Sequence, residues 1–179
     1  MWKFGRLTKS AALAVAVSTG PAAAMDDCLH GWWEADYSTM AEQFKATMQA
    51  SDVSVSGGAY LALAGADSGE YVVNDLQLEP VIPGAPAMTV TLNGGGAFTM
   101  VAEGGSYSAT MGAFSYSAKA QSPAFGVMEI PFDNANCPFG AGAGSYSCAG
   151  DILEFTEEPG SGPADSIVQR WNRLPGDPR

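Results

Sequence analysis

The sequence predicts an all-β protein, an antiparallel up-and-down β-barrel of about eight to ten strands with one short N-terminal helix. From residue 52 onward, segments of alternating apolar and polar residues are separated by Gly, Pro, Asn and Ser at short, even intervals. Parallel strands would need long helical crossovers between them, and this part of the sequence has no such pattern. Closure into a barrel would also remove the exposed edges of so many short strands.

The predicted barrel begins at Gly31-Trp32-Trp33, at the head of the strand series. Glycine allows the backbone to turn where the first strand crosses the barrel floor. A large indole ring can plug that closed end. We therefore expect Trp33 to be buried at the floor and Trp32 to lie on the other face of the strand.

Period-two alternation predicts half-buried strands, as in Met88, Val90 and Leu92 on one face. Asn93 to Gly96 predicts a hairpin turn, because Asn and Gly tolerate positive φ. Residues 66–87 have no clear place in an eight-strand pattern, and residues 134–145 and 157–163 are predicted loops. The expected strands are 53–64, 70–78, 87–92, 97–102, 107–111, 114–119, 125–131, 146–148, 152–156 and 166–174.

One helix is expected over residues 40–50. Thr39 followed by Glu42 fits a capping box at its start. Met40, Phe44 and Met48 recur at intervals of four and form a narrow apolar stripe. This stripe predicts a helix packed on the barrel, between the first two strands.

The first 24 residues have the composition of a signal peptide. Lys3, Arg6 and Lys9 form a positive region, residues 11–17 are apolar, and Ala22-Ala23-Ala24 supplies small residues at a cleavage site. The apolar run is too short to span a bilayer. We expect residues 25–179 to form one exported domain, periplasmic or secreted.

The chain is strongly acidic, with 8 Lys and Arg against 19 Asp and Glu and a net charge of −11. Loss of the three basic leader residues would leave five cations and a net charge of −14. Such a balance repels nucleic acids and anionic membrane surfaces. Neither a nucleic-acid partner nor a membrane span is expected.

Three cysteines in an exported chain predict one disulfide and one remaining thiol. Cys137 and Cys148 flank a Gly-rich segment, and the short loop between them favours their pairing. Pairing of Cys28 with either of the other two stays open, because spacing alone does not fix connectivity.

Catalytic and metal-binding patterns are weak. His30 is the single histidine, which excludes sites that need two. Cys28 beside His30 reads as the start of a strand rather than a reactive thiol. Glu154, Glu157 and Glu158 read as a solvated run of charge. We expect no metal, no cofactor and no enzymatic activity.

The layout resembles the lipocalin/calycin superfamily, with Gly31-x-Trp33, a helix, a strand meander and an arginine in the last strand. It is similar, more narrowly, to lipocalin-like domains of exported bacterial proteins of unknown function. Two short motifs carry this likeness. They are Cys28-Leu29-x-Gly31-x-Trp33 and Tyr146-x-Cys148-x-Gly150-Asp151-x-Leu153.

The resemblance implies roles for the arginines of the last strand. In lipocalins such an arginine lies over the opening Trp, which implies Arg170, or alternatively Arg173, over Trp33. The two differ by three positions, so in a strand they point to opposite faces. In fatty-acid-binding relatives a late inward arginine holds a ligand carboxylate, a role that would fall to Arg170.

The resemblance also implies a ligand in the barrel. Many strand positions carry small residues, which leave space that aromatic side chains could line. The expected function is binding of a small apolar or amphipathic molecule. The alternative is a structural or protein-interaction module of the cell envelope, with a filled barrel and a partner that the sequence does not name. The candidate lining residues are Tyr60, Tyr71, Phe98, Met100, Tyr107, Met111, Phe114, Tyr116 and Phe125, with Arg170.

Overall fold

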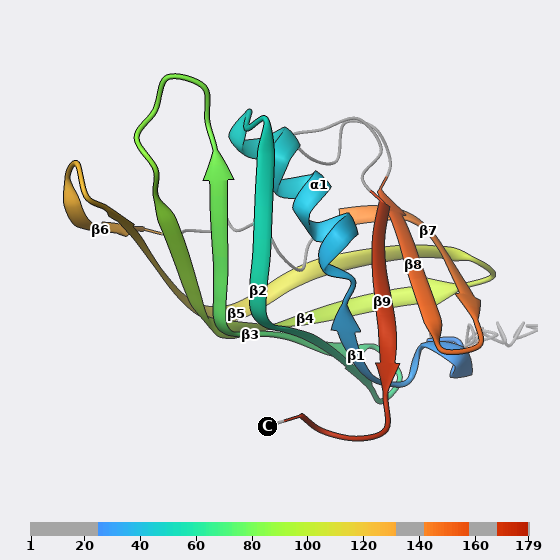
Figure 1. Ribbon diagram of the computed structural model, residues 1–179. Helices are drawn as coiled ribbons and strands as arrows, with labels where there is room; N and C mark the ends of the chain where they lie inside the picture. The colour runs from blue at the N-terminus through green and yellow to red at the C-terminus, as the bar shows by residue number, and fades with distance from the viewer. Residues whose placement is uncertain (1–24, 132–141, 158–167, 179) are drawn as a thin grey trace, which may run out of the picture.

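The computed structural model describes residues 25–131, 142–157 and 168–178. The predicted leader, Cys137 and most of both predicted late loops lie outside these residues. Within these described residues, a 3-10 turn, Asp27–Leu29, is followed by one helix and nine strands (Figure 1). They are β1 (Gly31–Ala35), α1 (Tyr37–Met48), β2 (Asp52–Ala64), β3 (Ser68–Val81), β4 (Thr89–Glu103), β5 (Ser106–Ser122), β6 (Gly126–Ile130), β7 (Gly142–Ala149), β8 (Ile152–Glu157) and β9 (Val168–Leu174).

Eight strands form a closed antiparallel up-and-down barrel, and β6 is an additional strand. Strands β1 to β5 pair in chain order, β5 pairs with β7, and β7, β8 and β9 follow in turn. The barrel closes where β9 pairs with β1, so that Trp33 lies between Leu61 on one side and Arg173 on the other. The predicted fold class is confirmed.

The predicted hairpin at residues 93–96 is wrong, because β4 runs straight through it. Asn93 instead holds a bulge in β3: its Oδ1 accepts from the backbone N–H of Asp75 at 2.8 Å. A Cβ on Gly94 would lie 2.0 Å from the carbonyl oxygen of Ser115. The glycines therefore permit close strand contact at an irregularity rather than a turn.

Two further sequence assignments change for the same reason. The predicted strands 107–111 and 114–119 are one strand, β5, with Gly112 in a bulge opposite Ala97. Residues 66–87 do have a place, because most of them form β3. Period-two alternation predicts the two faces of β5, and its interruption at Gly112 is a bulge rather than a turn.

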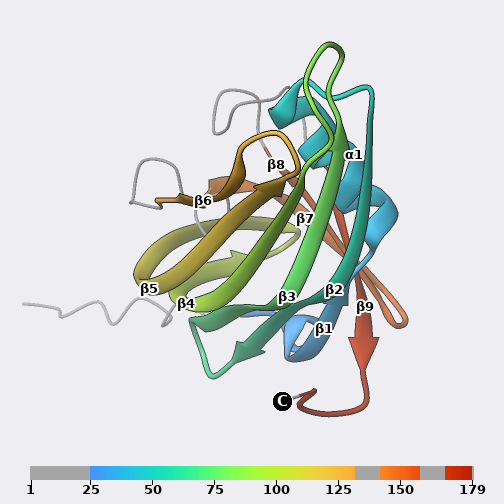
Figure 2. The same ribbon diagram turned by 60° about the vertical axis from the view of Figure 1, so that its left-hand side comes forward.

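The predicted helix exists, but its start differs. Asp36 is the N-cap, and its Oδ1 accepts from the backbone N–H groups of Ser38 at 2.9 Å and Thr39 at 3.2 Å. Thr39 is inside the first turn, so the capping box built on Thr39 and Glu42 is wrong. Met40 and Phe44 are buried, and α1 lies beside β2 and β9 across one end of the barrel (Figures 1 and 2).

The core fills much of the interior from the inward face of each strand. Phe98 shows how large and small residues alternate there: a Cβ on Gly69 would lie 2.2 Å from its ring. The helix of the described chain is too short and too polar to cross a membrane.

Candidate functional site

One end of the barrel is sealed by Trp33 and Arg173. The Trp33 side chain is fully buried, and its Nε1 donates to the carbonyl oxygen of Leu29 at 2.8 Å. The Arg173 guanidinium carbon lies 4.0 Å from the centre of the Trp33 ring system. Gly31 has φ of +133°, and a Cβ there would lie 3.0 Å from Arg173 Nη1. These contacts make a cation–π cap on the floor.

Arg173 also holds the N-terminal segment against this floor. Its Nη1 donates to the carbonyl oxygen of His30 at 2.7 Å, and Nη2 donates to that of Cys28 at 2.6 Å. Met25 in this segment is buried, and its N–H donates to the carbonyl oxygen of Ala66 at 2.8 Å. The floor is thus closed by the segment that precedes β1.

The disulfide joins Cys28 to Cys148, across 120 residues of sequence. The predicted Cys137–Cys148 bridge is therefore wrong. The short-loop argument favoured Cys137, but the fold places Cys28, in the segment just before β1, against the end of β7. Tyr146 on β7 adds a hydrogen bond from its hydroxyl to Asp26.

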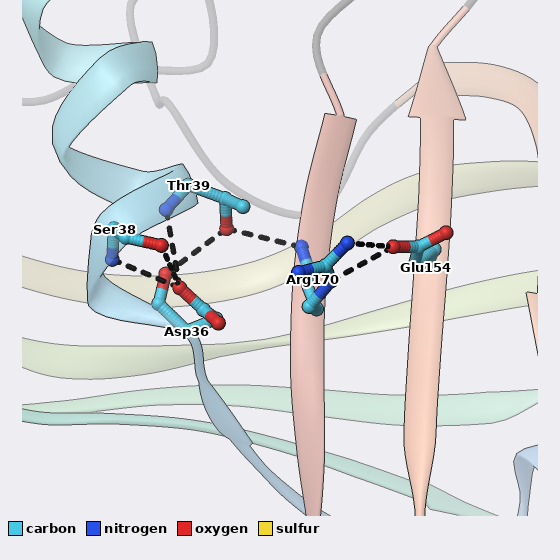
Figure 3. A network of polar contacts seen from close by, with 5 residues as sticks. All are labelled: Asp36, Ser38, Thr39, Glu154 and Arg170. Carbon is cyan, nitrogen blue, oxygen red and sulfur yellow. Dashed lines mark hydrogen bonds and ion pairs between the residues drawn. The ribbon is translucent and has the colours of Figure 1, made fainter. Parts of the chain in front are cut away.

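Arg170 is outside the barrel, which corrects both roles expected for it. Its Nε and Nη2 donate to Glu154 Oε1 at 2.8 and 2.5 Å (Figure 3). Its backbone N–H donates to Thr39 Oγ1 at 3.2 Å. The hydrogen bond to Glu154 and the negative charge of that carboxylate hold the pKa of Arg170 above its usual value. Arg170 therefore neither covers Trp33 nor points at an interior ligand.

The network in Figure 3 anchors the start of α1 on β9. Asp36 accepts from the Ser38 hydroxyl, and this bond is the largest cause of its lowered pKa. The Asp36 N–H donates to the carbonyl oxygen of Arg170 at 2.8 Å. This side-chain cluster fixes the helix rather than forming a reactive site.

Asp36→Ala is expected to lower the free energy of unfolding at neutral pH by about 1 kcal/mol, because two helix N–H groups lose their acceptor. Asp36→Asn should retain most of the capping. A lowered pKa means that the charged form stabilises the fold, so this contribution is lost as pH falls through the acidic range. Urea unfolding of Asp36→Ala and Asp36→Asn at neutral and at acidic pH tests this prediction. An equal loss of unfolding free energy in the two variants would contradict it.

The predicted lining residues separate into three groups. Tyr71, Phe98 and Met100 are buried in the core. Tyr60 is on the outer face, since its neighbours Ala59 and Leu61 point inward, and it lines a surface hollow with Val72 and Pro178. Phe125 is 43% exposed at the turn before β6. The remaining four face inward from β5 and are only partly buried: Tyr107, Met111, Phe114 and Tyr116.

The partly buried inward face belongs to the stretch where β5 changes partner. Residues 106–109 pair with β7 and residues 118–122 pair with β6. Figure 1 shows β6 and β7 at opposite sides of the molecule. Between these two ladders, β4 is the only partner of β5 among the described strands. Among the described strands the β5 ladder is therefore incomplete on one side over this stretch, where the inward-facing aromatic rings are only partly buried.

Two of the ring pairs among the described residues involve the inward rings of β5. Tyr107 and Phe155 meet edge to face with centroids 4.9 Å apart. Phe114 and Tyr116 stack at 5.7 Å. The aromatic surface is thus apolar, ordered by ring contacts and partly open, as expected of a pocket for an apolar molecule.

Sequence reasoning missed two polar residues that face the interior, Glu157 and Gln169. Glu157 shares a face of β8 with Leu153 and Phe155, and Gln169 is paired with Phe155. Gln169 Nε2 donates to Glu157 Oε1 at 3.2 Å. Burial raises the pKa of Glu157. The period-two pattern of β8 contained this information, because it places the carboxyl on the apolar face.

A small cavity lies beside this polar pair, between α1 and β9. It has a volume of about 10 Å³, which suits roughly one water molecule, and Met40, Tyr71 and Gln169 contribute to its lining. Trp171 also lines it, and its buried Nε1 has no hydrogen-bond acceptor in the described structure. Indole donors are normally satisfied when buried. The interior therefore has polar as well as apolar recognition groups.

Glu157→Gln is expected to stabilise the protein at neutral pH by about 0.5 kcal/mol, since a half-buried carboxylate keeps much of its solvent screening. A raised pKa means that the fold favours the protonated form, so the stability due to it is lost as pH rises. The gain should disappear below the usual Glu pKa of about 4.3. Thermal unfolding against pH measures it, and a gain that persists in acid would contradict it.

The described residues contain no group of three or more His, Cys, Asp or Glu side chains arranged to hold a metal ion. No protein-family model, curated protein sequence or solved structure matches this chain. The site is therefore argued from its own geometry.

Proposed function

We propose that this chain is an exported lipocalin-like protein that binds a small apolar or amphipathic molecule inside its barrel. The observation that supports it most is the partly open inward face of β5, with Tyr107, Met111, Phe114 and Tyr116. Apolar side chains that face a barrel interior are normally sealed by packing. Here they stay partly buried beside the incomplete ladder of the described strands, which supports the proposal that a ligand reaches them.

The lipocalin-like part of the proposal is supported by the floor. An opening Gly31-x-Trp33 and a last-strand arginine over that Trp are the features that the sequence resemblance implies. The eight-strand up-and-down closure is compatible with them. We propose that the sealed end and the partly buried inner face of β5 form a cup, the arrangement by which small barrels hold one ligand.

Export is supported by the disulfide and by the leader pattern of residues 1–24. Disulfides persist in oxidising compartments such as the periplasm or the extracellular space. We propose one of these locations.

The binding proposal is tested with the fluorescent apolar probe N-phenyl-1-naphthylamine. We expect saturable uptake of one probe per chain, weakened about fivefold or more in Phe114→Ala, because an inward contact is lost. Phe125→Ala is the matched control and should bind normally, since Phe125 is on the exposed turn before β6. Absence of saturable uptake by the folded protein would overturn the proposal, as would equal effects of the two variants.

The alternative, a protein-interaction module, is favoured by one observation. Within the described chain β6 pairs only with β5, and it exposes Val127 at 63% and Met128 at 54%. Extended apolar edges can pair with a strand of another protein. Cross-links in the cell envelope that disappear in Val127→Lys, together with absent probe uptake, would support this alternative.

A further inference from the structure

Glu157 and Gln169 form a polar pair on the inner wall, and Glu157 carries the one ionisable carboxyl group of that pair. Glu157 contributes a carboxylate, and Gln169 contributes an amide whose Nε2 is already donated to that carboxylate. Tyr107 lies in the same row, because it pairs with Gly144 of β7, which in turn pairs with Glu157 of β8. A carboxylate and aromatic rings therefore occupy one part of the inner wall.

The cations of the described chain are all placed elsewhere. Lys45 is on the exposed side of α1 beside Glu42, and Lys119 points outward from β5 opposite Glu129. Arg170 is paired with Glu154 outside the barrel. Arg173 is committed to the floor, on Trp33 and two backbone carbonyls. No described cation is therefore available to pair with Glu157 or to hold an anionic ligand near it.

Glycine leaves room beside the carboxyl group. Gly144 separates Tyr107 from Glu157 in their row, and a Cβ there would lie 2.0 Å from the carbonyl oxygen of Thr156, so this glycine permits close packing of β7 on β8. Gly142 is the residue that leaves the carboxyl uncovered, since a Cβ built there would lie 4.0 Å from the Glu157 carboxyl group. Ala109 opposite Gly142 adds only a methyl group. The inner wall therefore carries only small residues next to the Glu157 carboxyl group.

We propose that the ligand carries an organic ammonium or amine group, which binds to the Glu157 carboxylate beside the Tyr107 and Phe155 rings. A cation is attracted to a carboxylate and also to the electron-rich faces of aromatic rings. The ligand's apolar part then contacts the inward face of β5, which holds Met111, Phe114 and Tyr116. The proposal rests on the binding function above and specifies its ligand class.

Two physical arguments favour a cation over an anion. A bound ammonium group would supply the opposite charge that the half-buried Glu157 carboxylate lacks among the described residues. Partial desolvation of a carboxylate is costly when no opposite charge lies nearby. The net charge of −11 also attracts cations to the protein and repels carboxylates and sulfates. Arg170 was expected to hold the carboxylate of a fatty acid inside the barrel. No described residue of the interior takes over that role.

The test compares three amphiphiles with the same dodecyl tail, each below its micelle concentration, by isothermal titration of the purified full chain. They are dodecyltrimethylammonium, dodecyl maltoside and dodecanoate. We expect one site that binds the ammonium about tenfold or more tightly than dodecanoate, the value of one desolvated charge contact. The neutral maltoside should fall between them.

Variants separate a specific contact from general attraction to an acidic protein. Glu157→Gln should reduce the ammonium-to-dodecanoate ratio about tenfold and leave maltoside binding unchanged. Glu79→Gln removes the same charge at an exposed position and should leave the ratio nearly unchanged. Circular dichroism and thermal unfolding establish that both variants are folded.

The possible outcomes distinguish failure of the cation proposal from failure of the binding function. Equal affinity for the three amphiphiles, or equal effects of Glu157→Gln and Glu79→Gln, would overturn the cation proposal and leave the binding function standing. Absence of binding by every amphiphile would overturn both. Preference for dodecanoate would overturn the ligand class and would require a different interior contact.

Discussion

Loss of the Cys28–Cys148 disulfide is expected to lower the free energy of unfolding by about 2–5 kcal/mol. The bridge closes a loop of 120 residues. In the chain-entropy model a loop of that order restricts the unfolded ensemble strongly, at about 4–5 kcal/mol before any native strain. The bridge also keeps Cys28 close to Arg173, whose Nη2 donates to the Cys28 carbonyl oxygen at 2.6 Å.

The experiment needs a background in which no other disulfide can form. We would compare Cys28→Ser/Cys137→Ser with Cys137→Ser alone by guanidinium unfolding, with tryptophan fluorescence as the signal. Cys137→Ser keeps the observed bridge and should unfold at the concentration found for the unmodified chain. A loss of stability in Cys137→Ser as large as in the double variant would contradict the assignment.

The cysteine pairing shows what sequence alone could not supply. The spacing of the cysteines makes the loop between Cys137 and Cys148 the shorter one. Loop length is the only criterion for choosing between disulfide pairings that the sequence provides. The decisive term is tertiary: the segment before β1 crosses the floor and reaches the end of β7. No local pattern around Cys28 contains the position of β7.

The arginine assignment, by contrast, could have been made from the sequence. Arg170 and Arg173 were correctly expected on opposite faces of the last strand. Trp171 is the bulkiest apolar residue between them, and it is buried. In a period-two strand Trp171 shares its face with Arg173 rather than Arg170, so the inward arginine follows. The same reasoning applied to Leu153 and Phe155 would have placed Glu157 inside.

The glycine-rich stretch of β4 shows why the lengths of the strands could not be predicted from the sequence. Asn followed by glycines is equally suited to a hairpin turn and to a bulged strand, because both need unusual backbone angles or close contacts. Its neighbours decide: Asn93 bonds to Asp75, and Gly96 faces Phe114. Strand alternation predicted the fold class, while the length of each strand depended on such contacts across the sheet.

The candidate site was predictable in composition but not in arrangement. Aromatic residues on β5 were expected to face the interior, and Tyr107, Phe114 and Tyr116 do. Tyr60 was placed with them because its type suits a pocket, although its neighbours Ala59 and Leu61 mark the inward face of β2. The partial exposure of these rings depends on β5 pairing with β7 at one end and with β6 at the other. This pairing belongs to the whole sheet and is not visible in the local sequence.

Trp33→Ala is expected to lower the free energy of unfolding by about 3–5 kcal/mol, the usual cost of removing a large buried aromatic side chain. Trp33 is fully buried, so no solvent contact replaces what is lost. The carbonyl oxygen of Leu29 loses its donor, and the Arg173 guanidinium loses the ring beneath it. Trp33→Phe should cost less, because a smaller ring still fills part of the floor and faces the guanidinium.

Trp32→Ala is the matched control for this prediction. Trp32 is the adjacent residue on the opposite face of β1 and is only partly buried, so its removal should cost about 1 kcal/mol or less. Urea unfolding of the three variants, followed by far-ultraviolet circular dichroism, avoids dependence on the fluorescence of the removed residue. If Trp32→Ala cost as much as Trp33→Ala, the floor would owe its stability to the outer surface of β1 rather than to the buried ring.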